Sequence, residues 1–440
     1  MWVWKCVTPH PPIIVPEVGK GNEAAAADTV TAMKRLSARF SPLIPDTVLL
    51  LSPHAPYSEG LCVILADRYE GSFARFGAPE RKWSFRGAVG EGEALTREIS
   101  RNLPVTILRP QKGALDHASL VPLSFLGESW SGRTRLVLAN PIGMSPTDAY
   151  KLGKILAEFD DDASWGFIGS ADLSHRLFPG APAGFAPEGH SFDEAVVRAI
   201  REGGGAELLS LPDTLVEAAG ECGFRSVATF LGLTEKEHRT VLSYEGPFGV
   251  GYCVACAALD PAVYLPSLAR RTVEEMLETG RVLSAPPVDD DPVLSAANAC
   301  FVSLKTGDGN LRGCIGTILP QHAALVEEVI SNAVSAAFRD PRFPSVNRTE
   351  LADLHFSVDV LSRPERVNGI EELNPRIYGV ILEQGARRGV LLPDLEGVDT
   401  VEEQLRIAAM KAGIRDPHSS SIYRFTVERY KERRHSAEGQ

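Results

Sequence analysis

Short apolar runs alternate with longer amphipathic stretches through the first 260 or so residues of the chain. Runs of five or six apolar residues are typical of buried strands, and the amphipathic segments between them are typical of helices that cover a sheet. The pattern predicts strands at 2–7, 47–51, 61–66, 105–108, 135–139, 164–169, 241–244 and 250–259. It predicts helices at 23–40, 91–102, 146–159, 192–202 and 222–233. This order indicates an α/β fold with a central, mostly parallel sheet flanked by helices.

The pattern changes after Pro261, where a new amphipathic helix is predicted over 265–278. A hairpin, a second helix, further strands and a last helix follow, at 299–319, 323–338, 355–361, 377–382, 389–392 and 401–412. The 440 residues are too many for a typical single core. We therefore predict two domains, an α/β domain over 1–262 and an α+β domain over 263–440.

The composition and net charge of the chain limit the kinds of molecule that it is expected to bind. The net charge of −12 comes without a basic face to offset it, so neither nucleic acid nor an anionic membrane is expected as a partner. No apolar run reaches the length of about 18 residues that a membrane span needs, and the first residues do not resemble a signal peptide. Seven cysteines without regular spacing do not form a disulfide framework, which predicts a reducing, cytoplasmic location.

Four histidines follow short apolar segments: His10, His54, His117 and His175. We expect them on loops at strand ends, where they could meet in one site. Two histidines and a carboxylate form a recurrent ligand set for non-haem Fe(II), and two further histidines could serve as acid and base. Each histidine alone could equally be a loop or core residue whose ring is satisfied by a backbone carbonyl.

The third ligand has two main candidates, which are adjacent in the chain. Glu221 offers a carboxylate and Cys222 a thiolate, and Gly223 follows them. Cys222 could instead be a small buried apolar residue. Glu245 is a weaker candidate, because it reads as an ordinary loop carboxylate.

Short motifs around these histidines resemble one known family. They are Pro9-His10-Pro11-Pro12, Ser52-Pro53-His54, Asp116-His117 and Asp172-Leu173-Ser174-His175. Over roughly residues 1–260 the chain resembles the subunit-B (LigB-like, Memo-related) class III extradiol ring-cleavage dioxygenases. The resemblance implies that His10 and His54 ligate Fe(II) and that His117 and His175 act as acid–base groups. The dioxygenases use Glu as third ligand and the Memo relatives use Cys; we expect Glu221, since all four histidines match the dioxygenase pattern.

The second half resembles the AMMECR family over roughly residues 263–435. The matching stretches are Leu311-Arg312-Gly313-Cys314-Ile315-Gly316-Thr317, Arg339-Asp340-Pro341-Arg342-Phe343 and Arg388-Gly389-Val390-Leu391-Leu392-Pro393. Gly313 and Gly316 permit close backbone approach, and Arg312 could bind an anion. The alternative is a tight hairpin with a structural arginine.

These observations and resemblances lead to three functional expectations. The first is an Fe(II)-dependent extradiol-type dioxygenase that acts on a catechol-like aromatic substrate with O₂, with Zn or Cu as alternative metals. The second is a Memo-like redox protein that binds metal, lacks dioxygenase activity and works with a radical-SAM enzyme. The third is a non-catalytic binding module that keeps only the fold, which the intact acid–base histidines argue against.

Overall fold

The structure, a computed structural model, describes residues 1–130 and 132–432, which form two compact units that divide between Leu259 and Asp260. The predicted junction at 262/263 lies inside the first turn of helix α10 (Pro261–Thr279). Asp260 caps this helix, because its side chain accepts a hydrogen bond from the Ala262 amide, and Pro261 occupies the first helical position. The second unit therefore begins at a helix cap.

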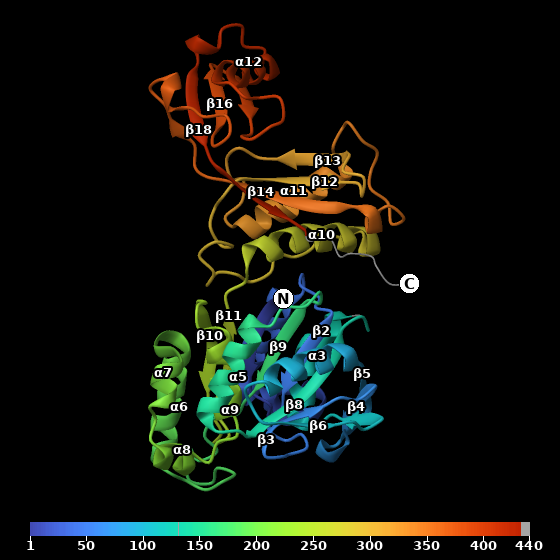
Figure 1. Cartoon of the computed structure of the whole chain (residues 1–440), viewed down its shortest axis with the longest axis vertical. Coiled ribbons are helices and arrows are strands. Elements are labelled where there is room, and N and C mark those ends of the chain that lie inside the picture. The colour runs from blue at the N-terminus through green and yellow to red at the C-terminus, as the bar shows by residue number, and fades with distance from the viewer. Residues whose placement is uncertain (131, 433–440) are drawn as a thin grey trace. The chain divides into compact units, whose positions relative to one another are not determined.

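The first unit is built on a mixed sheet of 11 strands, mostly parallel (Figure 1). Its middle consists of four parallel strands in the spatial order β1 (Trp2–Thr8), β9 (Trp165–Ser170), β2 (Thr47–Leu51) and β8 (Arg135–Gly143). These strands are almost wholly buried, which explains their continuous apolar runs. The predicted α/β fold is confirmed.

The remaining strands extend this sheet on both sides. β11 (Tyr252–Ala257) and β10 (Arg239–Glu245) follow β1, whereas β5 (Ala78–Gly87), β4 (Arg68–Phe73) and β7 (Lys112–Ala114) follow β8. β3 (Gly60–Ile64) pairs with β8 and with β6 (Val105–Leu108). The β4–β5 hairpin comes from an aromatic and charged segment that the sequence pattern did not assign.

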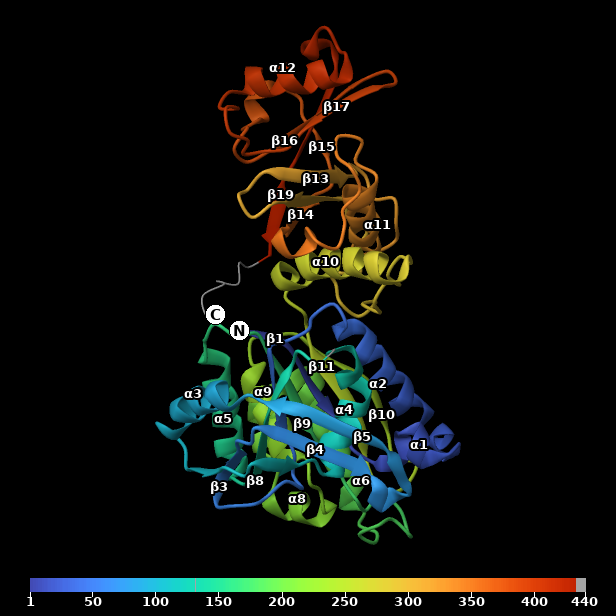
Figure 2. The ribbon, with the colours of Figure 1, turned by 90° about the vertical axis from the view of Figure 1, so that its right-hand side faces the viewer.

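Helices cover both faces of the sheet (Figure 2). One face carries α3 (Val89–Ser100), α5 (Pro146–Glu158) and α9 (Phe224–Leu233), and the other carries α2 (Ala27–Phe40) and α4 (His117–Leu126). α5 and α9 pack backbone to backbone at glycines: a Cβ on Gly153 would stand 2.0 Å from the Thr229 carbonyl oxygen. This contact holds α9, and the turn that precedes it, firmly against the sheet.

Two helix predictions need correction. The helix predicted over 222–233 begins at Phe224, so Cys222 lies in the preceding turn. The helix predicted over 192–202 begins earlier, as α6 (Glu188–Arg198), and passes through a π-helical turn at Ala199–Gly203 into α7 (Gly204–Leu209). A further helix, α8 (Asp213–Ala219), leads to the turn with Cys222.

The second unit has the predicted α+β composition, with two antiparallel sheets. The first has the order β13 (Leu311–Gly316), β12 (Cys300–Lys305), β14 (His355–Leu361) and β19 (Val427–Lys431), and packs against α10 and α11 (Leu325–Phe338). The second has the order β15 (Glu365–Arg366), β18 (Ser421–Phe425), β16 (Gly379–Gln384) and β17 (Arg387–Leu391), and carries α12 (Val401–Ala412) (Figure 1). Gly313 brings β13 onto α11, since a Cβ there would stand 2.2 Å from the Ala336 carbonyl oxygen.

Across residues 1–130 and 132–432, no helix combines the length and apolar character that crossing a membrane requires.

Because the first unit has its own sheet, helices and core, we expect residues 1–259 to fold without the rest of the chain. The expected result is a soluble fragment with one cooperative thermal transition and the metal content of the full chain. The measurement is calorimetry with metal analysis of both proteins. An insoluble fragment from a soluble full chain would show that the two units share stabilising contacts.

Candidate metal centre

The parallel strands at the middle of the first unit place their carboxyl ends at one edge of the sheet. β9 lies between β1 and β2 and is parallel to both. His10 follows the end of β1, His54 follows the end of β2, and Asp172 and His175 follow the end of β9. Because parallel strand ends meet at the same edge, residues far apart in the sequence come together there.

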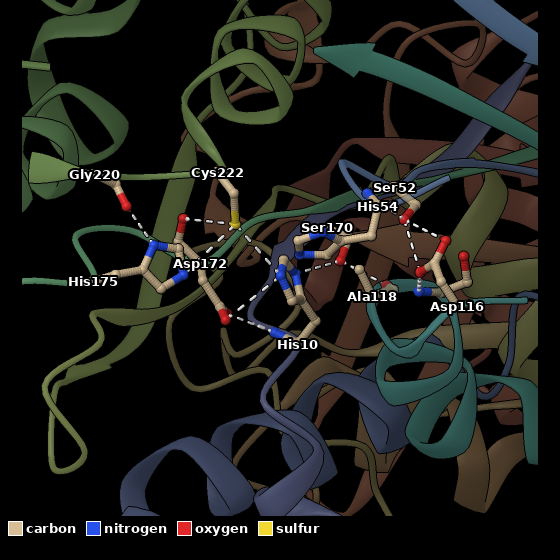
Figure 3. Close-up of polar contacts among 11 residues, drawn as sticks. His10, Ser52, His54, Asp116, Ala118, Ser170, Asp172, His175, Gly220 and Cys222 are labelled. Carbon is tan, nitrogen blue, oxygen red and sulfur yellow. Dashed lines mark hydrogen bonds and ion pairs between the residues drawn. The ribbon is translucent and has the colours of Figure 1, made fainter. Parts of the chain in front are cut away.

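His10, His54 and Cys222 form a group whose ligand atoms all lie within 4.8 Å of one another. Cys222 Sγ lies 3.5 Å from His10 Nε2 (Figure 3). Donors that lie about 2.0–2.3 Å from one tetrahedral ion are about 3.3–3.8 Å apart, so Cys222 and His10 already have a suitable separation and the group as a whole would close slightly around a metal. His10 is buried, whereas His54 is exposed and opens the group to solvent.

Hydrogen bonds select the tautomer of His10 that a metal needs. Ser170 Oγ donates to the Ala118 carbonyl oxygen at 2.6 Å, so it has no proton left for His10. It therefore accepts from His10 Nδ1, 2.9 Å away, and Nδ1 carries the ring proton. His10 Nε2 then presents a lone pair toward Cys222.

The surroundings of this lone pair fit a cation. Asp172 Oδ2 lies 3.5 Å from His10 Nε2, the same distance as Cys222 Sγ. Burial raises the pKa of the Asp172 carboxyl to about 7 and raises the pKa of the Cys222 thiol well above its usual value. His10 Nε2, Asp172 Oδ2 and Cys222 Sγ thus converge in a buried place where negative charge is unfavourable. A positive ion bound there would stabilise the ionised carboxylate and thiolate. Two imidazoles and a thiolate suit Zn, Fe or Cu.

His175 and His117 lie beside the group without belonging to it. His175 Nδ1 donates to the Gly220 carbonyl oxygen at 2.5 Å, which leaves Nε2 unprotonated, 3.9 Å from Cys222 Sγ. His117 stacks on His54 with ring centroids 4.6 Å apart. Burial lowers the pKa of both histidines, helped for His117 by the neighbouring His54, so both are neutral near pH 7. A neutral imidazole beside a metal can accept a proton.

His117 starts a helix, which corrects the prediction that it lies in a loop at a strand end. Asp116 caps α4 by accepting from the Ser119 amide at 2.8 Å, and it also accepts from Ser52 Oγ at 2.9 Å. Because Ser52 precedes His54, one carboxylate holds the chain segments of both stacked histidines. Asp116, Ser170 and Asp172 lie close to the predicted histidines in the sequence, but a local pattern does not show which groups they contact.

Comparison with known proteins shows the family to which the chain belongs. Residues 5–255 match the family model described as the catalytic LigB subunit of aromatic ring-opening dioxygenase. The chain belongs to this LigB family. Residues 266–433 match the AMMECR1 family model, so an AMMECR1 domain follows the LigB domain, and both resemblances seen in the sequence are confirmed.

One relative matches nearly the whole chain and others match about a third of it, and the names of those described here give no activity. A Clostridium acetobutylicum protein is 35% identical over 96% of this chain and 98% of its own length. A Thermotoga maritima protein is 51% identical over 37% of this chain and 94% of its own. The crystal structure of an uncharacterized Pyrococcus horikoshii protein (35% identity, TM-score 0.36) covers 39% of this chain and 91% of that one. The crystal structure of an uncharacterized Escherichia coli K12 protein (15% identity, TM-score 0.42) matches 58% of this chain and 99% of its own chain.

The LigB domain uses Glu221 and Cys222 differently from the expectation that Glu221 is the third ligand. The Glu221 carboxylate accepts a hydrogen bond from the Phe224 amide at 2.5 Å and lies 3.7 Å from the Arg225 guanidinium. It therefore stabilises the start of α9. Cys222, not Glu221, points at the histidines. Glu245 is also engaged elsewhere, since it accepts from the Thr29 amide at 2.6 Å and so supports the start of α2.

Gly223 allows the turn with Cys222 to reach the group. A Cβ on Gly223 would stand 2.6 Å from both the Ala171 Cβ and the Asp172 carbonyl oxygen. Only glycine permits this approach of the turn to the end of β9, and the approach is what brings Cys222 to His10.

In the AMMECR1 domain the Arg312 guanidinium is paired. It donates to both carboxylate oxygens of Glu350, at 2.9 and 3.0 Å. This pairing agrees with the structural alternative for Arg312 rather than with a free anion site.

Cys222→Ser should weaken metal binding, whereas Glu221→Gln should leave it unchanged. Serine lacks the thiolate, while glutamine retains an oxygen that can accept from the Phe224 amide. We expect the Cys222→Ser affinity to fall by at least about 10-fold, the smallest usual loss even for groups that only support a ligand. Fe(II) and Zn(II) titrations of protein prepared without oxygen provide the measurement. Metal lost with Glu221→Gln and kept with Cys222→Ser would restore Glu221 as the ligand.

A buried carboxylate on α6 holds the segment before His175. Asp193 accepts from the Ser174 amide and from the Tyr244 hydroxyl, both at 2.8 Å. Burial raises the pKa of Asp193 to about 7. In the unfolded chain the Asp193 carboxyl loses its proton at an ordinary, lower pH. The free energy of unfolding therefore decreases as the pH rises from about 4 to about 7.

Between about pH 5 and about pH 8, the free energy of unfolding should therefore decrease less in Asp193→Asn than in the wild type, by on the order of 2 kcal/mol. The measurement is urea unfolding of both proteins at the two pH values. Glu194→Gln, an exposed neighbour on the same helix, is the matched control. An unchanged pH dependence in Asp193→Asn would mean that Asp193 is ionised throughout.

Proposed function

We propose that the LigB domain is an Fe(II)-dependent extradiol-type dioxygenase that opens the ring of a catechol-like aromatic substrate with O₂. The observation that carries this proposal is the pair of neutral histidines, His117 and His175, beside the ligand atoms of His10, His54 and Cys222. The match to a family of aromatic ring-opening dioxygenases supports the reaction class.

His10, His54 and Cys222 would hold the iron. An Fe(II) ion bound there supplies an open coordination face for two adjacent hydroxyl groups of the substrate and for O₂. His54 is the exposed member of the group, so the substrate would enter on its side. The His10 ring is buried and is therefore not accessible to water.

His175 is suited to the role of general base. Its Nδ1 proton is committed to the Gly220 carbonyl oxygen, so Nε2 is the atom that takes a hydroxyl proton from the substrate. The same hydrogen bond stabilises the imidazolium that results. The lowered pKa of His175 keeps this base unprotonated near pH 7.

His117 stands next to the exposed ligand, on the side where the substrate enters. Its neutral ring carries one N–H and one lone pair, so it can donate a hydrogen bond to the substrate and relay a proton at its other nitrogen. Asp116, the preceding residue, favours a protonated His117 when one forms.

Cys222 favours a second candidate, a Memo-like redox protein without ring-cleaving activity. A thiolate is a softer donor than a carboxylate and suits copper or zinc as well as iron. In this candidate, the resemblance to the Memo family implies a radical-SAM enzyme as partner.

Metal analysis after purification without oxygen, followed by O₂ uptake with a panel of catechols, tests the proposal. Iron in the protein and stoichiometric O₂ uptake with formation of a yellow ring-opened product support the dioxygenase. Copper or zinc without catechol-dependent O₂ uptake favours the second candidate.

Replacing His175 or His117 by Ala should leave metal content near that of the wild type and lower turnover by roughly 10²- to 10⁴-fold, the usual worth of a positioned acid or base. The measurements are metal content and kcat of each variant. His238→Ala, which removes an exposed histidine before β10, is the control. Loss of metal in His175→Ala would make His175 a ligand, since its Nε2 lies only 3.9 Å from Cys222 Sγ.

A further inference from the structure

His117 differs from His10 and His175 in how its ring is held. His10 and His175 are each fixed through Nδ1 by a hydrogen bond, to Ser170 Oγ and to the Gly220 carbonyl oxygen. Within residues 1–130 and 132–432, the His117 ring has no such partner. Ring contacts hold it instead: the centroid of the His117 ring lies 4.6 Å from that of His54, 5.6 Å from that of His10 and 5.5 Å from that of Phe76.

Phe76 is not kept in place by burial. It ends a short 3₁₀ turn, Ala74–Phe76, between β4 and β5, and its side chain is 41% exposed. The turn is closed by Gly77, whose amide donates to the Ala74 carbonyl oxygen at 3.2 Å and whose φ of 77° suits glycine. The tilted ring of Phe76, at 59° to His117, therefore touches the imidazole while keeping an open side.

The hairpin that carries Phe76 and the segment that carries His117 form one rigid platform. β4 pairs in parallel with β7, which leads directly into Asp116 and His117. The Leu115 amide donates to the Glu70 carbonyl oxygen at 2.9 Å. A Cβ on Gly71 would stand 2.7 Å from the Leu115 carbonyl oxygen, which shows how closely β4 meets the chain before α4. Backbone pairing thus places the turn that carries Phe76 near the start of α4.

We propose that Phe76 is a positioning residue for His117: its ring holds the imidazole against His54, as the Gly220 carbonyl oxygen holds the ring of His175. The inference rests on the proposed function, in which His117 relays a proton for the substrate. A ring without a hydrogen-bonded anchor can turn about its side-chain bonds, and a wrongly turned ring presents the wrong nitrogen. Packing between His54 and Phe76 restricts this rotation.

Replacement of Phe76 by Ala should free the His117 ring. The measurement is NMR of the metal-free full chain labelled with ¹³C and ¹⁵N at histidine. The His117 ring signals are identified by their loss in His117→Gln. These signals should broaden or split in Phe76→Ala. They should remain as in the wild type in Phe76→Tyr, which keeps the ring, and in Arg75→Ala, a change at an exposed residue of the same turn. If Phe76→Ala does not fold, Phe76→Leu, which keeps apolar volume without the ring, takes its place.

Turnover gives the second readout. With catechol, kcat of Phe76→Ala should fall by about 10- to 100-fold, the range that misplacement of a reacting group costs, while KM changes little. Unchanged His117 signals in Phe76→Ala would overturn the proposal, as would a rise in KM with kcat intact, which would make Phe76 a substrate contact. A wild type that does not turn over catechols would overturn the dioxygenase, and the ring signals would still decide the role of Phe76.

Discussion

Parallel pairing of β9 with β1 on one side and β2 on the other is the constraint on which the site depends. The register sets Thr8 beside Ser170 and Leu51 beside Gly169, so the three strands end at the same level. The loops that follow then carry His10, His54 and His175 to one place. A slip of one residue would turn the buried faces of these strands over and move the histidines apart, so the candidate metal centre depends on the register.

The polar groups around the candidate metal ligands contribute both to the fold and to the site. Ser170 closes β9, donates to the first turn of α4 and fixes the tautomer of His10. An unsatisfied buried polar group costs about 1–3 kcal/mol, so the fold is least costly when each of these bonds is formed. The arrangement that is most stable is therefore also the one that leaves His10 Nε2 and His175 Nε2 as free lone pairs.

Much of this could be predicted from the sequence, because apolar runs reveal buried strands and the histidines come directly after them. The α/β and α+β classes, and the approach of His10, His54, His117 and His175 to one region, follow from such local signals. Contacts between distant segments leave no local signal. The role of Ser170 depends on the Ala118 carbonyl oxygen, and the contact of Phe76 with His117 depends on a hairpin whose pairing the pattern did not reveal.

The choice between Glu221 and Cys222 shows how a helix start can decide the chemistry of a metal site. α9 begins after Gly223, which has no side chain to accept from the first helical amides. Gly223 has to be glycine because the turn lies so close to Asp172. Glu221 supplies the missing acceptor to the Phe224 amide, and that use turns its carboxylate away from the histidines. Cys222, adjacent in the chain and facing the other way, is left to complete the ligand group. The close approach that makes the site thus also favours a soft sulfur ligand over a hard oxygen ligand.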